Sequence, residues 1–116
     1  MNNETIPFEE SLFINQNAKY ILSILNKDIK SSSWLLTNGI HKIGRLNDKE
    51  IILDDVTVSR NHAYISVDDD ELLIIDEGST NGIFVNGKIT KESKLYSGTR
   101  IQIGKYYLIV SSVDES

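Results

Sequence analysis

The feature that most constrains the fold is a series of short apolar runs, separated at regular intervals by turn-forming residues. The runs are rich in Ile, Val, Leu and Tyr, and several alternate apolar with polar side chains, as strands with one buried face do. They are YILSIL, WLLT, EIIL, AYISV, ELLIID, IFV, RIQIG and YYLIVSS. Many short strands with regular punctuation are typical of a β-sandwich or barrel. The sequence therefore predicts an all-β fold.

The connections between these runs are rich in glycine, asparagine, aspartate and serine, the residues that turns favour. One of them, Asn86-Gly87 in FVNGKI, fits a two-residue type I′ turn, because both residues tolerate positive φ. The sequence therefore predicts a tight hairpin across residues 84–89.

The size of the chain predicts one domain. A chain of 116 residues can bury enough apolar surface to fold without disulfide staples. Residues 1–18 are polar and lack strand patterning, so we expect a flexible N-terminal tail at 1–18 and a domain at 19–116. No signal peptide and no apolar run of membrane-spanning length is visible. We therefore expect a cytoplasmic protein without a membrane partner.

The distribution of charge restricts the partners. A net charge of −5 argues against nucleic-acid binding, because that affinity depends on many cationic contacts to phosphates. Residues 63–79 hold six acidic side chains and no basic one, whereas residues 80–116 hold five basic and three acidic side chains. This uneven distribution is compatible with a site for a single anionic group.

Three predicted connections carry polar side chains that can donate hydrogen bonds. Arg45 ends one apolar run, Ser59 and Arg60 shortly precede another, and Thr80 and Asn81 lie within the turn EGSTNG. Loops at one end of a β-sandwich converge on one surface. Guanidinium and hydroxyl groups suit a phosphate dianion, and the Asn81 amide can pair with a peptide backbone because it both donates and accepts. Together they predict a phosphopeptide-binding site.

The same three blocks resemble the forkhead-associated (FHA) domain family. The resemblance rests on IGR, on SRNHA beginning fourteen residues after Arg45, on GSTNGIFVNG and on a terminal IQIG strand. It covers roughly residues 19–113. It implies a β-sandwich of about eleven strands in two sheets, with the recognition loops at one end, and the binding of phosphothreonine peptides.

The resemblance also implies a role for each candidate residue. Arg45 and Ser59 would bind the phosphate, Thr80 would help to line the phosphothreonine pocket, and Asn81 would clamp the peptide main chain. The position after the serine often meets the ligand in this family, and here it is Arg60.

Four further residues match positions that support the site in the family. They are Gly44, His62, Gly82 and Asn86. His62 stands next to Ala63 at a strand start, and we expect it to tie two loops together without touching the ligand.

Each binding residue also has a simpler structural explanation. Arg45 could be a surface ion-pair partner for a nearby aspartate, and Arg60 could be a solvated side chain. Ser59 could bond its own backbone in a turn. Thr80 and Asn81 could be only the tip of a turn, since asparagine tolerates left-handed geometry.

Motifs for catalysis, cofactors and metals are missing or incomplete. Ser59 and His62 lack the nucleophile elbow of a serine hydrolase. GIHKIGRL has the glycine spacing of a P-loop but not its Lys-Ser/Thr pair. Cysteine is absent, and two distant histidines make no zinc site. We therefore expect a protein that is not an enzyme and that has neither a cofactor nor a metal ion.

The predicted function is phosphothreonine-dependent binding of a protein partner in kinase signalling, with a Ser/Thr kinase and its substrates as partners. The alternative is a phosphate-independent FHA-fold interaction or scaffold protein that uses a sheet face. The tail holds Thr5, with Phe8 three residues later, and FHA domains commonly select at the third position after the phosphothreonine. Phosphorylation of Thr5 could therefore make the tail an intramolecular ligand that inhibits the domain.

Overall fold

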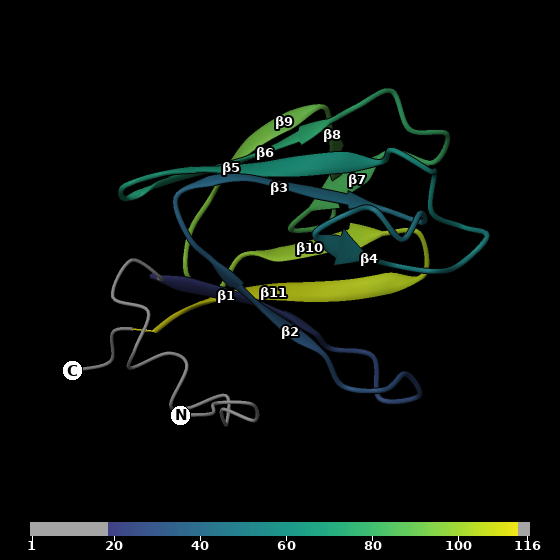
Figure 1. Cartoon of the computed structure of the whole chain (residues 1–116), viewed down its shortest axis with the longest axis horizontal. Helices are drawn as coiled ribbons and strands as arrows, with labels where there is room; N and C mark the ends of the chain where they lie inside the picture. Colours follow the sequence, from purple (N-terminus) through teal and green to yellow (C-terminus); the bar gives the residue numbers. More distant parts are fainter. Residues whose placement is uncertain (1–18, 114–116) are drawn as a thin grey trace, which may run out of the picture.

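The computed structural model describes residues 19–113, so the tail at 1–18 and its Thr5 lie outside the described residues. The described part of the chain forms eleven β-strands (Figure 1). Within it there is no helix long and apolar enough to cross a membrane. The strands are β1 (Tyr20–Ile24), β2 (Ser33–Leu36), β3 (Gly39–Gly44), β4 (Ile51–Ile52), β5 (Ala63–Asp68), β6 (Glu71–Asp76), β7 (Ile83–Val85), β8 (Lys88–Thr90), β9 (Glu92–Leu95), β10 (Arg100–Ile103) and β11 (Tyr106–Ser112).

The strands form two sheets that pack face to face as a sandwich. One sheet has six strands in the order β2-β1-β11-β10-β7-β8, and the other has five in the order β4-β3-β5-β6-β9. All pairs are antiparallel except the short parallel pair of β3 and β4. In Figure 1, β3, β5, β6 and β9 of the five-stranded sheet lie above β1, β10 and β11 of the six-stranded sheet. The predicted all-β sandwich of about eleven strands in two sheets is confirmed.

The core lies between the two sheets and is built from alternate residues of each strand. In β5, Ala63, Ile65 and Val67 are buried, whereas the intervening Tyr64 and Ser66 are only half-buried. Each fully buried aliphatic side chain contributes about 1.5–3 kcal/mol through removal from water. Alternation within short strands therefore fixes the register in which these strands face the core.

The β7–β8 hairpin has the geometry that its sequence predicts. Asn86 and Gly87 have φ angles of 50° and 85°, the positive values that a type I′ turn requires at both central residues. The Asn86 side-chain oxygen also accepts a hydrogen bond from the Arg100 N–H at 3.0 Å. Asn86 therefore shapes the turn and ties it to β10.

Three strands were not among the predicted apolar runs: β8, which the predicted hairpin implies, and β3 and β9. β9 places only Leu95 in the core, and β3 reaches the core chiefly through Ile43, with Lys42 exposed. The strands β3 and β9 are defined by their pairing, β3 with β5 and β9 with β6. Their strand character comes from tertiary partners, which local patterning does not show.

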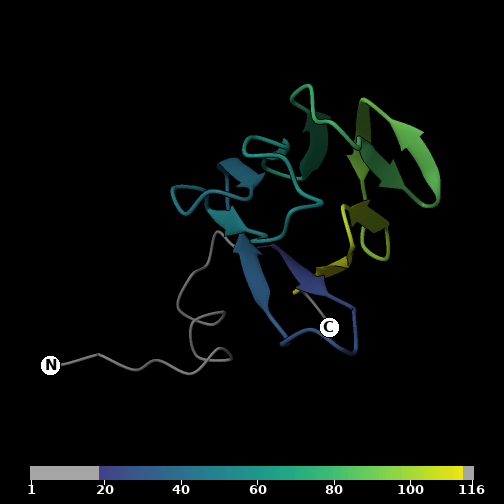
Figure 2. The same cartoon turned by 90° about the vertical axis from the view of Figure 1, so that its right-hand side faces the viewer.

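One end of the sandwich gathers the connections that carry the candidate residues. Gly44 ends β3 there, residues 53–62 lead into β5, and residues 77–82 link β6 to β7. The turn at residues 104–105 between β10 and β11 lies at the same end, because Lys105 bonds to Thr57. Figure 2 looks onto this end, which is the right-hand side of Figure 1. The fold thus brings together segments that are far apart in the sequence.

Candidate functional site

A pocket of about 380 Å³ opens between the three connections at this end. All five residues that the sequence singles out for binding line it. The lining residues are Arg45, Val56, Thr57, Val58, Ser59, Arg60, Gly78, Thr80 and Asn81.

Arg45 follows directly after β3 and is half-buried. Its backbone N–H donates to the Ser59 carbonyl at 3.1 Å, and its Nε donates to the Val58 carbonyl at 3.1 Å. Among residues 19–113, no carboxylate forms an ion pair with its guanidinium. Arg45 is therefore anchored by the neighbouring connection at its Nε and keeps its terminal N–H groups for another acceptor.

Ser59 joins two connections through its hydroxyl. The Ser59 Oγ accepts a hydrogen bond from the backbone N–H of Thr80 at 3.0 Å. Since the oxygen is the acceptor in this bond, the hydroxyl hydrogen is left to donate into the pocket. The Ser59 side chain therefore bonds the backbone of another loop and not the backbone of its own turn.

His62 is fully buried and bonds the same two connections, residues 53–62 and residues 77–82, to each other. Its Nδ1 accepts the Ser59 N–H at 3.0 Å, so its Nε2 carries the hydrogen and donates to the Gly82 carbonyl at 2.8 Å. Both ring nitrogens are thereby occupied within the protein. His62 supports the site and has no ring nitrogen left for a ligand.

Two glycines permit the close approach of these segments. A Cβ on Gly44 would overlap the carbonyl oxygen of Arg60. Gly82 has a φ of +80°, and a Cβ there would lie 3.0 Å from the Ile89 side chain. A larger residue at Gly44 would push the connection that carries Arg60 away from β3.

The turn before β7 is held by Asp76 and Ser79. The Asp76 carboxylate accepts hydrogen bonds from the Gly78 N–H at 3.1 Å, from the Ser79 N–H at 3.3 Å and from the Ser79 hydroxyl. The Ser79 Oγ in turn accepts the Gly82 N–H at 2.9 Å. Ser79 thus shapes the turn from inside, which leaves the next two residues at its exposed tip.

Thr80 and Asn81 are exposed at this tip. The Asn81 Nδ2 donates to the Thr57 carbonyl at 3.0 Å. The Asn81 Oδ1 and the second amide hydrogen have no partner within residues 19–113. A second hollow of about 320 Å³ lies against the other side of the tip, next to Ile89 and Lys91.

Arg60 is exposed at the rim of the pocket, and no carboxylate within residues 19–113 forms an ion pair with it. Two guanidinium groups therefore face the pocket without a counter-charge. The carboxylate of Asp76, at the end of β6, already accepts three hydrogen bonds. This donor set suits an anion that carries two charges.

Four lining residues were not predicted from the sequence: Val56, Thr57, Val58 and Gly78. Val56 is 86% exposed, an unusual position for a valine. The spacing of Asp55 and Thr57 could have predicted a turn here, because an aspartate often bonds the backbone two residues on.

Among residues 19–113, no cluster of three His, Cys, Asp or Glu side chains could hold a metal ion.

Comparison with known proteins points to one family. Over 78 residues, or 67% of this chain, the sequence is 42% identical to the glycogen accumulation regulator GarA of Mycobacterium tuberculosis, of which the match covers 48%. Over 78 residues it is 44% identical to the oxoglutarate dehydrogenase inhibitor of Corynebacterium jeikeium, with 67% of this chain and 54% of that protein covered. The chain thus spans about half the length of the curated relatives it matches.

Solved structures agree with these sequence matches. A structure from a structural and functional study of phosphothreonine-dependent FHA domain interactions is similar with a TM-score of 0.77 and 32% identity, covering 84% of this chain and 99% of that one. The family model of the FHA domain matches residues 41–104. These residues run from β3 to the β10–β11 turn and contain the whole pocket, so the chain belongs to the FHA domain family.

Proposed function

We propose that this chain is a phosphothreonine-dependent peptide-binding module and not an enzyme. The observation that carries the proposal is the convergence of Arg45, Ser59, Arg60, Thr80 and Asn81 on one pocket of about 380 Å³. Among residues 19–113, no acidic side chain lines this pocket. Its chemistry is that of a donor-rich receptor for a phosphate group.

In this proposal, Arg45 is the main anchor of the phosphate. Its terminal N–H groups are available, and its planar fork matches two phosphate oxygens. The Ser59 hydroxyl donates a further hydrogen bond, and Arg60 adds charge at the rim. We place the threonine methyl group near Thr80, which lines the pocket, and near Gly82, which lines the adjoining hollow.

Asn81 clamps the peptide main chain. One of its amide hydrogens is engaged by Thr57, so its Oδ1 and its other hydrogen remain for a peptide N–H and a peptide C=O. A side chain that both donates and accepts pairs with any sequence, because the backbone groups it meets are always present. Selectivity then comes from the phosphate and from neighbouring side chains.

The names of the relatives support a regulatory role for such binding. One is called a regulator and another an inhibitor, and the similar structure was studied for phosphothreonine-dependent interactions. We propose that this chain acts likewise, by binding a protein that a Ser/Thr kinase has phosphorylated. The partner is a phosphoprotein and not a nucleic acid.

The tail is a candidate ligand of the same site. Thr5 precedes Lys19 by fourteen residues, and Lys19 lies at the far end of the sandwich, where it bonds to Asp70. The distance from Lys19 to the pocket is about the length of β11, which has seven residues and spans roughly 24 Å at about 3.4 Å per residue. If the fourteen residues 5–18 behave as a free chain, they would span about 20 Å on average and about 48 Å when extended. Phosphorylated Thr5 can therefore reach the pocket, at an effective concentration on the order of millimolar.

The phosphate-independent alternative has one observation in its favour. The outer face of the six-stranded sheet has a hollow of about 450 Å³, whose lining includes Phe84 and the half-exposed Tyr107. A partner that used this face would bind without phosphate and without Arg45.

An oriented phosphothreonine peptide library, with its unphosphorylated counterpart as the control, tests the proposal. We expect binding to the phosphorylated library by the wild type and not by Arg45→Ala. Equal binding of both libraries would favour the sheet face. For the tail, amide NMR of the Thr5-phosphorylated chain should show shifts near Arg45, Ser59 and Asn81 that are absent in Arg45→Ala, and unchanged shifts would exclude the intramolecular ligand.

A further inference from the structure

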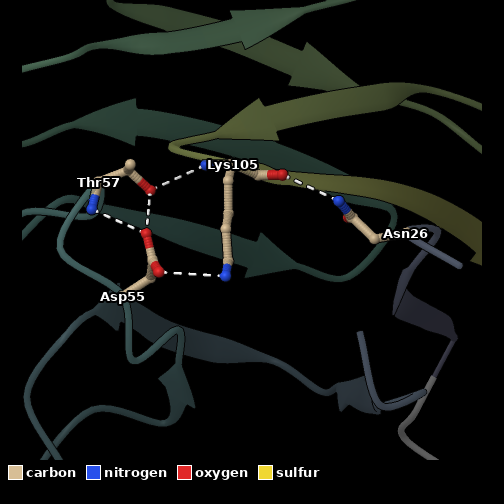
Figure 3. A network of polar contacts seen from close by, with 4 residues as sticks. All are labelled: Asn26, Asp55, Thr57 and Lys105. Atoms are coloured by element: carbon tan, nitrogen blue, oxygen red, sulfur yellow. Dashed lines mark hydrogen bonds and ion pairs between the residues drawn. The ribbon is translucent and has the colours of Figure 1, made fainter. Parts of the chain in front are cut away.

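We infer that Thr57 is the positioning residue of this site, acting through a cluster of polar contacts with Asp55, Lys105 and Asn26 that we call the Thr57 clasp (Figure 3). The inference rests on the proposed function. The clasp joins the connection at residues 53–62, which carries Ser59 and Arg60, to the β10–β11 turn.

The Thr57 hydroxyl is the centre of the clasp. It donates to the Asp55 Oδ2 at 2.6 Å and accepts the backbone N–H of Lys105 at 2.9 Å. The backbone N–H of Thr57 donates to the same Asp55 oxygen at 2.9 Å. One hydroxyl thus acts as both donor and acceptor between two segments that are 48 residues apart. Valine has the same shape and can do neither.

Lys105 closes the clasp on its other side. Its Nζ forms an ion pair with the Asp55 Oδ1 at 3.2 Å. Its carbonyl accepts the Asn26 Nδ2 at 2.9 Å, and the Asn26 Oδ1 accepts the Tyr107 N–H at 2.7 Å. The clasp therefore fastens residues 53–62 to the β10–β11 turn, and Asn26 fastens that turn to the β1–β2 connection, as Figure 3 shows.

Gly104 makes this approach possible. It has a φ of +57°, and a Cβ at this position would overlap the Thr57 hydroxyl oxygen. Only glycine both accepts this backbone conformation and leaves room for the threonine. The β10–β11 turn is thus built to receive Thr57.

The backbone that the clasp holds is the backbone that orients the binding side chains. The Thr57 carbonyl accepts the Asn81 Nδ2 at 3.0 Å, and the next carbonyl, of Val58, accepts the Arg45 Nε at 3.1 Å. Ser59 follows directly. Fixing residues 57–58 therefore fixes the orientation of the peptide clamp and of the phosphate anchor at once.

This backbone needs such support because it lies outside the sheets. Residues 53–62 form no strand. A binding loop that is ordered before the ligand arrives loses less conformational entropy on binding. The clasp therefore contributes to affinity by ordering the free site, without a contact between Thr57 and the phosphate.

The test compares Thr57→Val with Thr57→Ser, which keeps the hydroxyl. Thr99→Val is the matched control. Thr99 is buried, and its hydroxyl accepts the Tyr96 N–H at 2.9 Å. It stands directly before the first residue of β10, at the end of the sandwich remote from the pocket. Calorimetry measures the affinity for the best peptide of the phosphothreonine library, and NMR measures the side-chain amide shifts of Asn81 in the free protein.

We expect Thr57→Val to weaken peptide binding about fivefold or more and to shift the Asn81 amide signals. Thr57→Ser and Thr99→Val should each stay within about twofold of the wild type. The inference is overturned if Thr57→Val binds like the wild type, or if Thr99→Val weakens binding equally. If the wild type binds no phosphopeptide, the proposed function fails. The Asn81 amide signals of the free protein then test the Thr57 clasp alone. A shift of these signals in Thr57→Val supports the clasp, and unchanged signals overturn it.

Discussion

The two ends of this sandwich are both made of polar connections, yet they differ in how the polar groups are used. At the end remote from the pocket, the ion pair of Lys19 with Asp70 joins side chains that are 51% and 81% exposed. Lys94 and Glu71 form a similar exposed pair at 3.6 Å. Exposed pairs of this kind contribute about 0–1 kcal/mol. One further bond joins two connections there, since the Asp69 N–H donates to the Asn38 Oδ1 at 2.8 Å.

At the pocket end, several polar groups bond one connection to another, and they converge on one pocket. His62 joins Ser59 to Gly82, and the Ser59 hydroxyl bonds Thr80. The terminal N–H groups of the Arg45 guanidinium take no part in these bonds and remain available to a ligand. The pocket end thus combines unpaired guanidinium donors with a framework of bonds between connections, and this combination makes it the candidate anion site. Turn composition alone does not distinguish the two ends.

The largest effect on stability should follow His62→Ala. The substitution leaves the Ser59 N–H and the Gly82 C=O without partners in a buried place. Each such group costs about 1–3 kcal/mol, so we expect the free energy of unfolding to fall by about 2–5 kcal/mol. Urea unfolding measures it. A loss below about 1 kcal/mol would mean that water replaces the ring easily.

Arg45→Ala should abolish most phosphopeptide binding while the fold survives. A charge-assisted contact contributes roughly 1.5–3 kcal/mol, so the affinity should fall at least about tenfold. Arg45→Lys should not restore it, because an ammonium group does not reproduce the guanidinium fork. Calorimetry checks both variants, and restoration by lysine would show that charge alone is recognised.

The phosphothreonine peptide should bind more tightly than its phosphoserine analogue. The serine peptide keeps the phosphate but lacks the methyl group that we place near Thr80 and Gly82. Loss of one methyl group from a fitted pocket costs about 1–3 kcal/mol. Competition titration of the two peptides measures the difference. Affinities within a factor of two would show that no pocket recognises the methyl group.

Asp55 should give the pocket end its own pH dependence. Hydrogen bonds from the Thr57 hydroxyl and then from the Thr57 N–H lower the pKa of Asp55 from 3.8 to about 2. A carboxylate with a lowered pKa stabilises the fold above pH 3.8, and this contribution is lost as the pH falls through about 2. Thr57→Val should raise the pKa of Asp55 toward its ordinary value. NMR titration of the Asp55 carboxyl group checks this, and an unchanged pKa would count against the hydroxyl as its cause.

The smallest effects should come from the remote end. Asp70→Asn removes the ion pair with Lys19, which is exposed, so unfolding should change by less than about 0.5 kcal/mol. Peptide affinity should be unaffected. A clear loss of binding in this variant would show that the two ends are coupled, contrary to the contrast drawn between them.

Local signals explain which parts could be predicted from the sequence. The hairpin at Asn86-Gly87 is determined by two adjacent residues. The sandwich follows from strand patterning and punctuation, and its prediction is confirmed. The five candidate binding residues stand in short motifs within three connections, and the fold brings them to one pocket.

The rest depends on contacts that no local pattern carries. The bond between Thr57 and Lys105 joins residues that are 48 positions apart, and it exists because Gly104 admits the threonine. β9 becomes a strand by pairing with β6, although only Leu95 enters the core. Such features follow from the folded arrangement and so are visible only in the structure.

We propose that this chain recognises phosphate through the pocket beside Arg45. Calorimetric titration of the wild type with one library-selected peptide, in phosphothreonine and unmodified threonine forms, tests it most directly. We predict binding of the phosphorylated form and at least about tenfold weaker binding of the plain form, because the charge-assisted contacts are lost. Equal affinity for the two peptides would contradict the claim.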